Sequence, residues 1–176
     1  MKNVLVLAIL LLSSTVYAGR PLEKTDIIVT ANVFIYESKV DTSPGGPSET
    51  KVTIYDFKGG YLVSKGWYVG AIYTMRSTQN GSGDESGTAL GASGGYYFQN
   101  GFYVAAHYIF DAKLGDFKEG SGFQADLGYI TSVSGSLYVG VELTHRNISY
   151  KSSDTIVFDK HTVTEMMPML TVGVRF

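Results

Sequence analysis

Apolar and polar residues alternate with a period of two through most of this chain, and this pattern restricts its fold more than any other feature. In residues 26–37 the odd positions from Ile27 to Ile35 are apolar and the even positions are mixed, and in 101–114 the even positions are apolar. Successive side chains of a β-strand point to opposite faces of a sheet, whereas a helix repeats its apolar residues every three to four positions. The pattern therefore predicts an all-β protein whose strands have one apolar face and one mixed, polar face.

Eight segments with this alternation follow one another after residue 24, and the connections between them are alternately short and long. The short connection at Asn100-Gly101 is the strongest hairpin signal, because this dipeptide favours the tight turns that join antiparallel strands. The order predicts an up-and-down meander with short turns at one end and polar loops at the other. The expected strands span residues 25–39, 49–64, 66–78, 87–99, 101–114, 119–132, 136–150 and 160–176, and the expected loops span 41–48, 79–86, 115–118 and 151–159.

The first eighteen residues differ from the rest and are expected to be a signal peptide. Lys2 precedes an apolar run over 4–12, and small residues stand before a predicted cleavage site between Ala18 and Gly19. The run would cover only ~14 Å as a helix, about half of a bilayer, which is typical of a secretory signal and too short for a membrane anchor. We therefore expect a signal peptide at 1–18 and one β-domain at 19–176.

Large aromatic residues on the apolar faces bear on whether this domain is soluble or lies in a membrane. A soluble barrel buries its apolar face, whereas a membrane barrel turns that face to lipid and frames it with two aromatic girdles. A group beside the long loops comprises Tyr55, Tyr73, Tyr108, Phe110 and Phe123. The expected girdle beside the short turns comprises Tyr61, Trp67, Tyr96, Phe98, Phe102, Tyr129 and Phe176.

The polar faces carry acids and bases in the middle of the strands. A cation that faced lipid there would cost about 2–4 kcal/mol, whereas inside a lumen acids and bases can pair. An open sheet edge would leave backbone groups unpaired in lipid, so the sheet is expected to close. We expect an all-β, closed eight-stranded antiparallel up-and-down transmembrane β-barrel, with a soluble barrel as the alternative. The expected polar network of the lumen comprises Asp56, Lys58, Arg76, His107, Asp111, Lys113, Asp126, Glu142, Arg146, Glu165 and Arg175.

The chain ends in a strand, 169–176, that alternates apolar residues and finishes on an aromatic one. With the signal peptide, the eight alternating strands and the absence of cysteine, this ending resembles Gram-negative outer-membrane β-barrel proteins, in particular the small eight-stranded group that includes OmpX, the OmpA membrane domain and OmpW. The resemblance implies a place in the outer membrane of the cell envelope, and partners in periplasmic chaperones and the barrel-assembly machinery. The residues that match the group's assembly signal are Val172, Val174 and Phe176, with Val174 standing where the group commonly has an aromatic residue.

The function is less constrained than the fold. Because eight strands enclose a lumen just wide enough for side chains to fill, the charged residues are expected to plug it, which favours a structural or surface-interaction role. A porin-like narrow channel for ions or small solutes is one alternative. A transporter with an apolar pocket is another, and the residues that would line that pocket are Ile54, Leu62, Ile72, Ile109, Ile130, Met167 and Met169.

An enzyme that modifies lipid A is a further alternative, and the sequence argues against it. His145 and Ser149 form the single His/Ser pair on one face of one expected strand. Four residues along a strand separate two side chains by ~13 Å, whereas a nucleophile and its base must approach to ~2.6–3.2 Å. We therefore expect no catalytic site and no enzymatic activity.

The composition excludes several other kinds of site. Without cysteine there is no disulfide and no thiolate ligand, and His107, His145 and His161 stand on different expected strands, so neither a metal site nor a cofactor is expected. A net charge of −2 argues against binding to nucleic acid. The expected partners are outer-membrane lipid and lipopolysaccharide, whose phosphates the basic residues near the loops would meet, and the barrel is expected to be a monomer.

Overall fold

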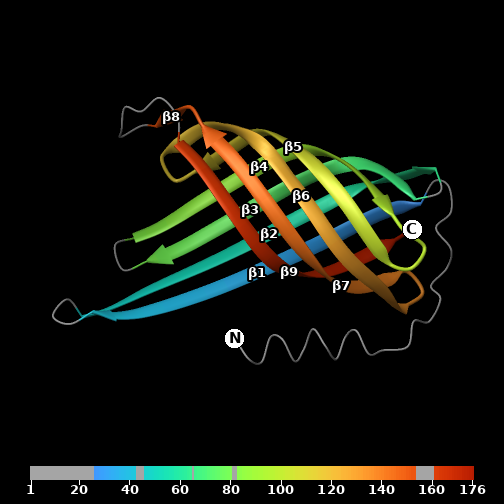
Figure 1. Cartoon of the computed structure of the whole chain (residues 1–176), viewed down its shortest axis with the longest axis horizontal. Coiled ribbons are helices and arrows are strands. Elements are labelled where there is room, and N and C mark those ends of the chain that lie inside the picture. Colours follow the sequence, from blue (N-terminus) through green and yellow to red (C-terminus); the bar gives the residue numbers. More distant parts are fainter. Residues whose placement is uncertain (1–25, 43–45, 65, 81–82, 154–160) are drawn as a thin grey trace.

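The computed structural model describes residues 26–42, 46–64, 66–80, 83–153 and 161–176, and all regular elements within them are β-strands (Figure 1). Eight of these strands correspond to the eight expected segments. The additional strand β8 has two residues and pairs with the start of β6. The strands are β1 (Ile27–Thr42), β2 (Gly46–Ser64), β3 (Trp67–Asn80), β4 (Gly83–Tyr97), β5 (Phe102–Leu114), β6 (Phe117–Ser134), β7 (Leu137–Tyr150), β8 (Ser152–Ser153) and β9 (His161–Arg175).

The eight long strands form one closed antiparallel ring. Each pairs with its neighbours in the order β1, β2, β3, β4, β5, β6, β7 and β9, and β9 returns to pair with β1. Figure 1 shows these strands wrapped side by side around a single axis. The ring confirms the expected all-β, up-and-down barrel, and it pairs mid-barrel backbone groups on both sides, as a hydrocarbon environment requires. Among the described residues, no helix is long and apolar enough to cross a membrane.

Two hairpins extend further at the loop end than the polar sequence predicts. Pairing between β1 and β2 continues to Thr42 and Gly46, and pairing between β3 and β4 continues to Asn80 and Gly83. Residues 46–48 and 83–86, which were expected in loops, therefore belong to strands. Backbone hydrogen bonds between antiparallel strands do not require apolar side chains, so a polar stretch can continue a ladder beyond the apolar band.

The ring closes less completely between β1 and β9 than elsewhere. The ladder between these strands ends where Val33 pairs with Leu170, whereas β9 pairs with β7 along its whole length. In Figure 1 the outer parts of β1 and β2 run together away from β9. We call this part, residues 34–42 of β1 and 46–54 of β2, the projecting ribbon.

Pro168 explains why the ladder stops at this point. Ile27 and Phe176 exchange backbone hydrogen bonds of 3.2 and 3.0 Å, and in an antiparallel ladder such hydrogen-bonded pairs recur at every second residue. In this register the pair that would follow Val33 and Leu170 is Ile35 and Pro168. Proline has no N–H to donate, so the ladder loses a bond at that pair and the strands diverge.

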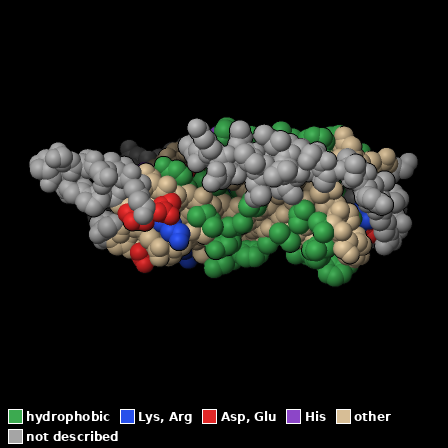
Figure 2. All heavy atoms as spheres, turned by 90° about the horizontal axis from the view of Figure 1, so that it is seen from below, with side chains coloured by type: hydrophobic (Ala, Val, Ile, Leu, Met, Phe, Trp, Pro, Cys, Tyr) green, Lys and Arg blue, Asp and Glu red, His purple; other side chains and the backbone are tan. Residues whose placement is uncertain are grey.

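The outer face carries the large apolar side chains. Both aromatic groups point outward, with Trp67 at 60% and Phe123 at 67% of their full exposure. Figure 2 shows hydrophobic side chains across the middle of one face and charged side chains toward both ends. An exposed apolar band with aromatic residues at each edge is the surface of a transmembrane barrel, and it is the inverse of a soluble barrel.

The lumen is filled in layers. At the turn end, Tyr68, Tyr97 and Tyr103 pack with Leu62 and Ile28, and Tyr97 stacks on Tyr103 with ring centroids 4.9 Å apart. At the loop end, two further clusters of buried apolar residues fill the barrel. The seven residues considered above for an apolar pocket all pack within these three clusters: Ile54, Leu62, Ile72, Ile109, Ile130, Met167 and Met169.

A glycine makes room for the aromatic layer. The ring of Tyr103 lies over Gly128, where a Cβ would stand 2.3 Å from the ring carbon Cζ. Any side chain at this position would displace the ring, so Gly128 fixes where Tyr103 can cross the lumen.

A β-bulge in β5 places two charged residues on the outer face, although they were expected in the lumen. Leu90 of β4 pairs with Asp111, but the adjacent Gly91 pairs with Ile109, so β5 contains one extra residue at Phe110. An extra residue inverts the alternation beyond it. Asp111 and Lys113, which were expected in the lumen, are therefore exposed on the outer face. Ala112 and Leu114 replace them inside, where they are buried.

Candidate functional site

The middle of the lumen contains a cluster of ions centred on Lys58. The Lys58 ammonium donates to Glu142 Oε2 at 2.6 Å and to Oε1 at 2.7 Å, and it also donates to Asp126 Oδ2. These three side chains come from β2, β7 and β6, so the cluster spans the barrel. None of the three residues is more than 6% exposed. In such a dry setting, paired ions attract strongly, and an unpaired ion is costly.

A second ion pair lies beside the first, toward the loop end. Arg146 Nη2 donates to both carboxylate oxygens of Asp56 at 2.8 Å, and the Thr74 hydroxyl donates to Asp56 Oδ1 at 2.7 Å. Gln124 links the two centres, because its amide nitrogen donates to Asp56 at 3.1 Å and to Asp126 at 3.0 Å. Its amide oxygen accepts from Arg146 Nε at 2.7 Å. The two ion pairs therefore form one continuous network, which we call the central network.

Neutral donors complete the coordination of Glu142. Asn32 Nδ2 donates to it at 2.7 Å, the Tyr103 hydroxyl at 2.5 Å and the Thr144 hydroxyl at 2.9 Å. The three carboxylates of the central network exceed its two permanent cations by one charge. Hydrogen bonds to a charged acceptor are among the strong ones, so these neutral donors stabilise the excess negative charge. The charge pattern of the sequence did not identify Asn32, Thr74, Tyr103, Gln124 or Thr144, although their parity on the strands places them on the lumen face.

His107 links Ser93 to Asp126 of the central network, and the combination of Ser, His and Asp also occurs in hydrolases. Its Nδ1 lies 2.7 Å from Ser93 Oγ, and its Nε2 lies 2.7 Å from Asp126 Oδ2. Spacing along one strand cannot reveal this chain, because its members come from β4, β5 and β6. All three side chains are buried, with apolar layers toward both ends of the barrel. Their position makes them part of the packed lumen, and His145 points away from them on the outer face.

Two ion pairs lie at the ends of the lumen. Arg76 Nη1 donates to Glu165 Oε1 at 2.5 Å near the loop end, with side chains 18% and 19% exposed. Arg175 Nε lies 3.3 Å from Asp26 Oδ2 near the turn end, and its guanidinium sits 5.3 Å from the centre of the Tyr138 ring. The loop-end pair is more exposed than the ions of the central network, whereas the turn-end pair is as buried as they are.

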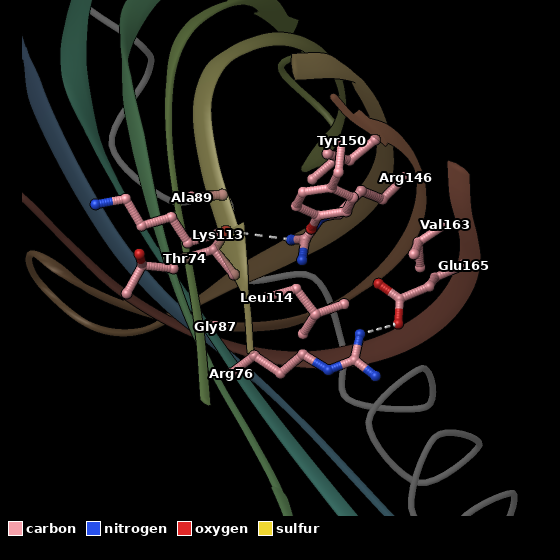
Figure 3. A pocket seen from close by; sticks show the side chains of 12 residues that line it. Thr74, Arg76, Gly87, Ala89, Lys113, Leu114, Arg146, Tyr150, Val163 and Glu165 are labelled. Atoms are coloured by element: carbon pink, nitrogen blue, oxygen red, sulfur yellow. Dashed lines mark hydrogen bonds and ion pairs between the residues drawn. The ribbon is translucent and has the colours of Figure 1, made fainter. Parts of the chain in front are cut away.

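A small pocket, open to solvent, lies around the loop-end pair (Figure 3). Figure 3 shows the Arg76 guanidinium and the Glu165 carboxylate pointing toward each other, with Leu114 beside them and Tyr150 farther from Arg76. Arg146 of the central network contributes to its lining. We call this the mouth pocket. Among the described residues, no group of three or more His, Asp or Glu side chains could hold a metal ion.

The remaining expected site residues lie on the outer face or outside the described part of the chain. The C-terminal strand presents Val172 and Phe176 outward, and Val174 is half-buried. The expected cleavage site at Ala18 and Gly19 lies outside the described residues. The residues expected in the turn-end girdle are exposed or half-buried: Tyr61, Trp67, Tyr96, Phe98, Phe102, Tyr129 and Phe176.

Comparison with known proteins identifies the fold and no closer relationship. No protein-family model matches the chain, and no curated protein matches it in sequence. The crystal structure of the outer membrane protein OprG from Pseudomonas aeruginosa is similar, with a TM-score of 0.51 and 13% sequence identity over 90% of this chain and 98% of that one. The structure of the outer membrane protein AlkL in lipid bilayers has a TM-score of 0.47 and 11% identity over 93% of this chain and 96% of that one.

Proposed function

We propose that this chain is an outer-membrane protein whose lumen is sealed by the central network and whose role is structural or interfacial at the cell surface. The observation that carries the proposal is the burial of the central network between apolar layers. Lys58, Asp126, Glu142, Asp56 and Arg146 bridge the barrel with every carboxylate accepting several hydrogen bonds. A side-chain network of this kind has little room for a solute.

Three features support a place in the outer membrane. The outer face carries an apolar band with aromatic residues at both edges, which we propose mark the two membrane interfaces. The fold is shared with the outer membrane protein OprG. The sequence begins with an expected signal peptide at 1–18. On this proposal Val172, Val174 and Phe176 form the signal for the barrel-assembly machinery, periplasmic chaperones deliver the chain, lipopolysaccharide surrounds the loop end, and the barrel is a monomer of the small eight-stranded group.

Single-molecule conductance in planar lipid bilayers tests the sealed lumen. Purified, refolded protein is expected to insert without stable current steps. Arg146→Ala removes a long side chain from the central network and is expected to produce steps, whereas Lys51→Ala removes an exposed cation from β2 and is expected to leave the bilayer silent. Stable steps from the unaltered protein would contradict the sealed lumen.

A narrow channel is the second candidate, and the mouth pocket is the observation that favours it. The pocket reaches Arg146, so the Arg146–Asp56 pair would be the barrier that an ion must pass. A channel predicts steps from the unaltered protein whose size or selectivity changes in Arg146→Ala. The same recordings therefore separate the two candidates.

A further inference from the structure

We propose that the lumen binds ordered water molecules beside the central network, at a site built by Asn32 of β1 and Thr171 of β9. The bound water joins the two strands at which the ring closes to the hydrogen bonds of Glu142. The inference goes beyond the proposed function, because neither a sealed lumen nor a narrow channel requires a water molecule at this place.

Four buried oxygen atoms without a hydrogen-bond partner are the first argument. They are Asn32 Oδ1, Tyr68 Oη, Tyr138 Oη and Thr171 Oγ1, and no other buried side-chain oxygen or nitrogen of the described residues lacks a partner. Asn32 is 1% and Thr171 is 2% exposed. Leaving a buried polar atom unpaired is costly, and such atoms are usually satisfied by protein groups or by ordered water.

Asn32 and Thr171 stand opposite each other where β1 meets β9. They are paired residues of the ladder between these strands, and both side chains are buried in the lumen. Paired residues of an antiparallel ladder have Cα atoms about 4.5–5.5 Å apart, yet these two side chains share no direct hydrogen bond. One water molecule at this spacing can accept from the Thr171 hydroxyl and donate to Asn32 Oδ1.

The protein around Asn32 has already committed its donors. Asn32 Nδ2 donates to Glu142 at 2.7 Å, which leaves Oδ1 as an acceptor in need of a donor. Asp56 stands opposite Asn32 on β2, and a carboxylate can only accept. The Lys58 ammonium is directed to Asp126 and Glu142. Water can supply the donor that these neighbours do not.

Tyr68 shows the same lack of a partner in the aromatic layer at the turn end. Its ring lies across two glycines, because a Cβ would stand 2.7 Å from the ring at Gly60 and 2.5 Å from the hydroxyl at Gly70. The backbone of β3 pairs with β2 on one side and with β4 on the other, so its polar groups are used in ladders. The Tyr68 hydroxyl therefore needs a partner from the lumen, and a second water molecule can provide it.

Water fits these atoms better than a metal cation does. The central network carries one excess negative charge, which alone would favour a cation. Three of the four unpaired atoms are hydroxyl oxygens, and a hydroxyl also has a proton to donate, which a cation cannot accept. The Lys58 ammonium already contacts Glu142, the carboxylate to which Asn32 donates, so a second cation there would be repelled.

NMR of the full barrel in detergent micelles tests the proposal, with two buried side-chain amides compared in one sample. The Asn32 amide is expected to show NOE signals to water with the sign that a long-lived bound molecule gives. Gln124 is the matched control, because its amide oxygen accepts from Arg146 and its nitrogen donates to Asp56 and Asp126. Its amide is expected to show no such signal.

The sign of a stability change gives a second, independent readout. Thr171→Val keeps the shape of the side chain and removes a partner of the water, so the midpoint of unfolding by urea in lipid vesicles is expected to fall by about 0.3–1 M. If the hydroxyl were dry and unpaired, its removal would leave the midpoint unchanged or raise it. Thr88→Val, on the outer face, is expected to have no effect.

Tyr68→Phe applies the same test to the second water molecule. It keeps the ring against Gly60 and Gly70 and is expected to lower the urea midpoint, and it supplies the stability readout if Thr171→Val does not fold. Thr171→Val is also expected to remove the water signal of the Asn32 amide, while Tyr68→Phe is expected to retain it.

Three results would overturn the proposal. One is a water signal at the Asn32 amide no stronger than at Gln124. Another is an unchanged or raised urea midpoint in Thr171→Val, which would show a dry, unpaired hydroxyl. The last is a midpoint of the unaltered protein that differs between sodium, potassium and choline chloride at equal ionic strength, which would assign the site to a cation. Conductance plays no part in these readouts, so a failure here is distinct from a failure of the sealed lumen.

Discussion

The central network and the loop-end ion pair use the same residue types in different ways. At Lys58 the ammonium bridges two carboxylates, and each carboxylate accepts further hydrogen bonds from neutral neighbours. At the mouth, Arg76 and Glu165 share one contact and remain partly exposed. Because water competes for exposed ions and not for buried ones, breaking the first arrangement is expected to cost more stability than breaking the second.

The largest expected effect comes from breaking the central network. Lys58→Met removes the cation between Asp126 and Glu142 and leaves two buried carboxylates facing each other, so it is expected to lower the free energy of unfolding by about 3–5 kcal/mol. Unfolding by urea in lipid vesicles, followed by heat-modifiable mobility on gels, measures this loss. Lys51→Met, on the outer face, serves as the matched control. A loss below that of Arg76→Gln would show that the centre is no more important than the mouth.

A smaller effect is expected where the two ion pairs are linked. Gln124→Leu preserves size but removes the amide that connects Asp56, Asp126 and Arg146. It leaves buried polar groups without a partner, which costs about 1–3 kcal/mol in the free energy of unfolding. The same urea titration measures the change. If Gln124→Leu has no effect, the two ion pairs act independently and the central network is two separate sites.

Pro168 in β9 lies where the ladder between β1 and β9 stops, and its replacement tests whether the proline separates the two strands. Pro168→Val restores an N–H at the pair with Ile35 and is expected to extend the ladder between β1 and β9. One new backbone hydrogen bond adds about 0.5–1.5 kcal/mol of stability. Slower hydrogen exchange of the Ile35 amide would report the new pair directly. Unchanged exchange at Ile35 would mean that proline is not what separates the strands.

The smallest effect is expected from the loop-end pair itself. Arg76→Gln removes a partly exposed ion pair, and pairs of this kind contribute about 0–1 kcal/mol to stability. The urea midpoint should therefore stay close to that of the unaltered protein. A large loss of stability in this variant would place Arg76 in the folding core and remove the contrast with Lys58.

The alternation of the sequence predicted the faces of the barrel but not its interruptions. Two-residue periodicity placed Lys58, Asp126 and Glu142 on one face, and the structure brings those three together. Asp111 and Lys113 have the same parity as His107, yet they lie outside because of the extra residue at Phe110. A bulge leaves no mark in a pattern of apolar and polar residues, so parity fails beyond it.

The sequence also could not predict which side chains contact each other across neighbouring strands. Ser93, His107 and Asp126 meet because β4, β5 and β6 pair in a particular register, and no motif records that register. Pro168 was visible as a proline in an expected strand. Its consequence depends on which residue of β1 stands opposite, and that residue is set by how the ring closes.

The projecting ribbon gives the barrel a part whose size can change independently. Its β1 arm pairs with β2 and has no ladder with β9 beyond Val33, so the register of the ring does not depend on how far the arm reaches. Adding two residues to each arm would lengthen it by about 7 Å and leave every other pairing in place. Residues, including a foreign epitope, can therefore be added to the projecting ribbon without changing the strand pairing in the rest of the barrel.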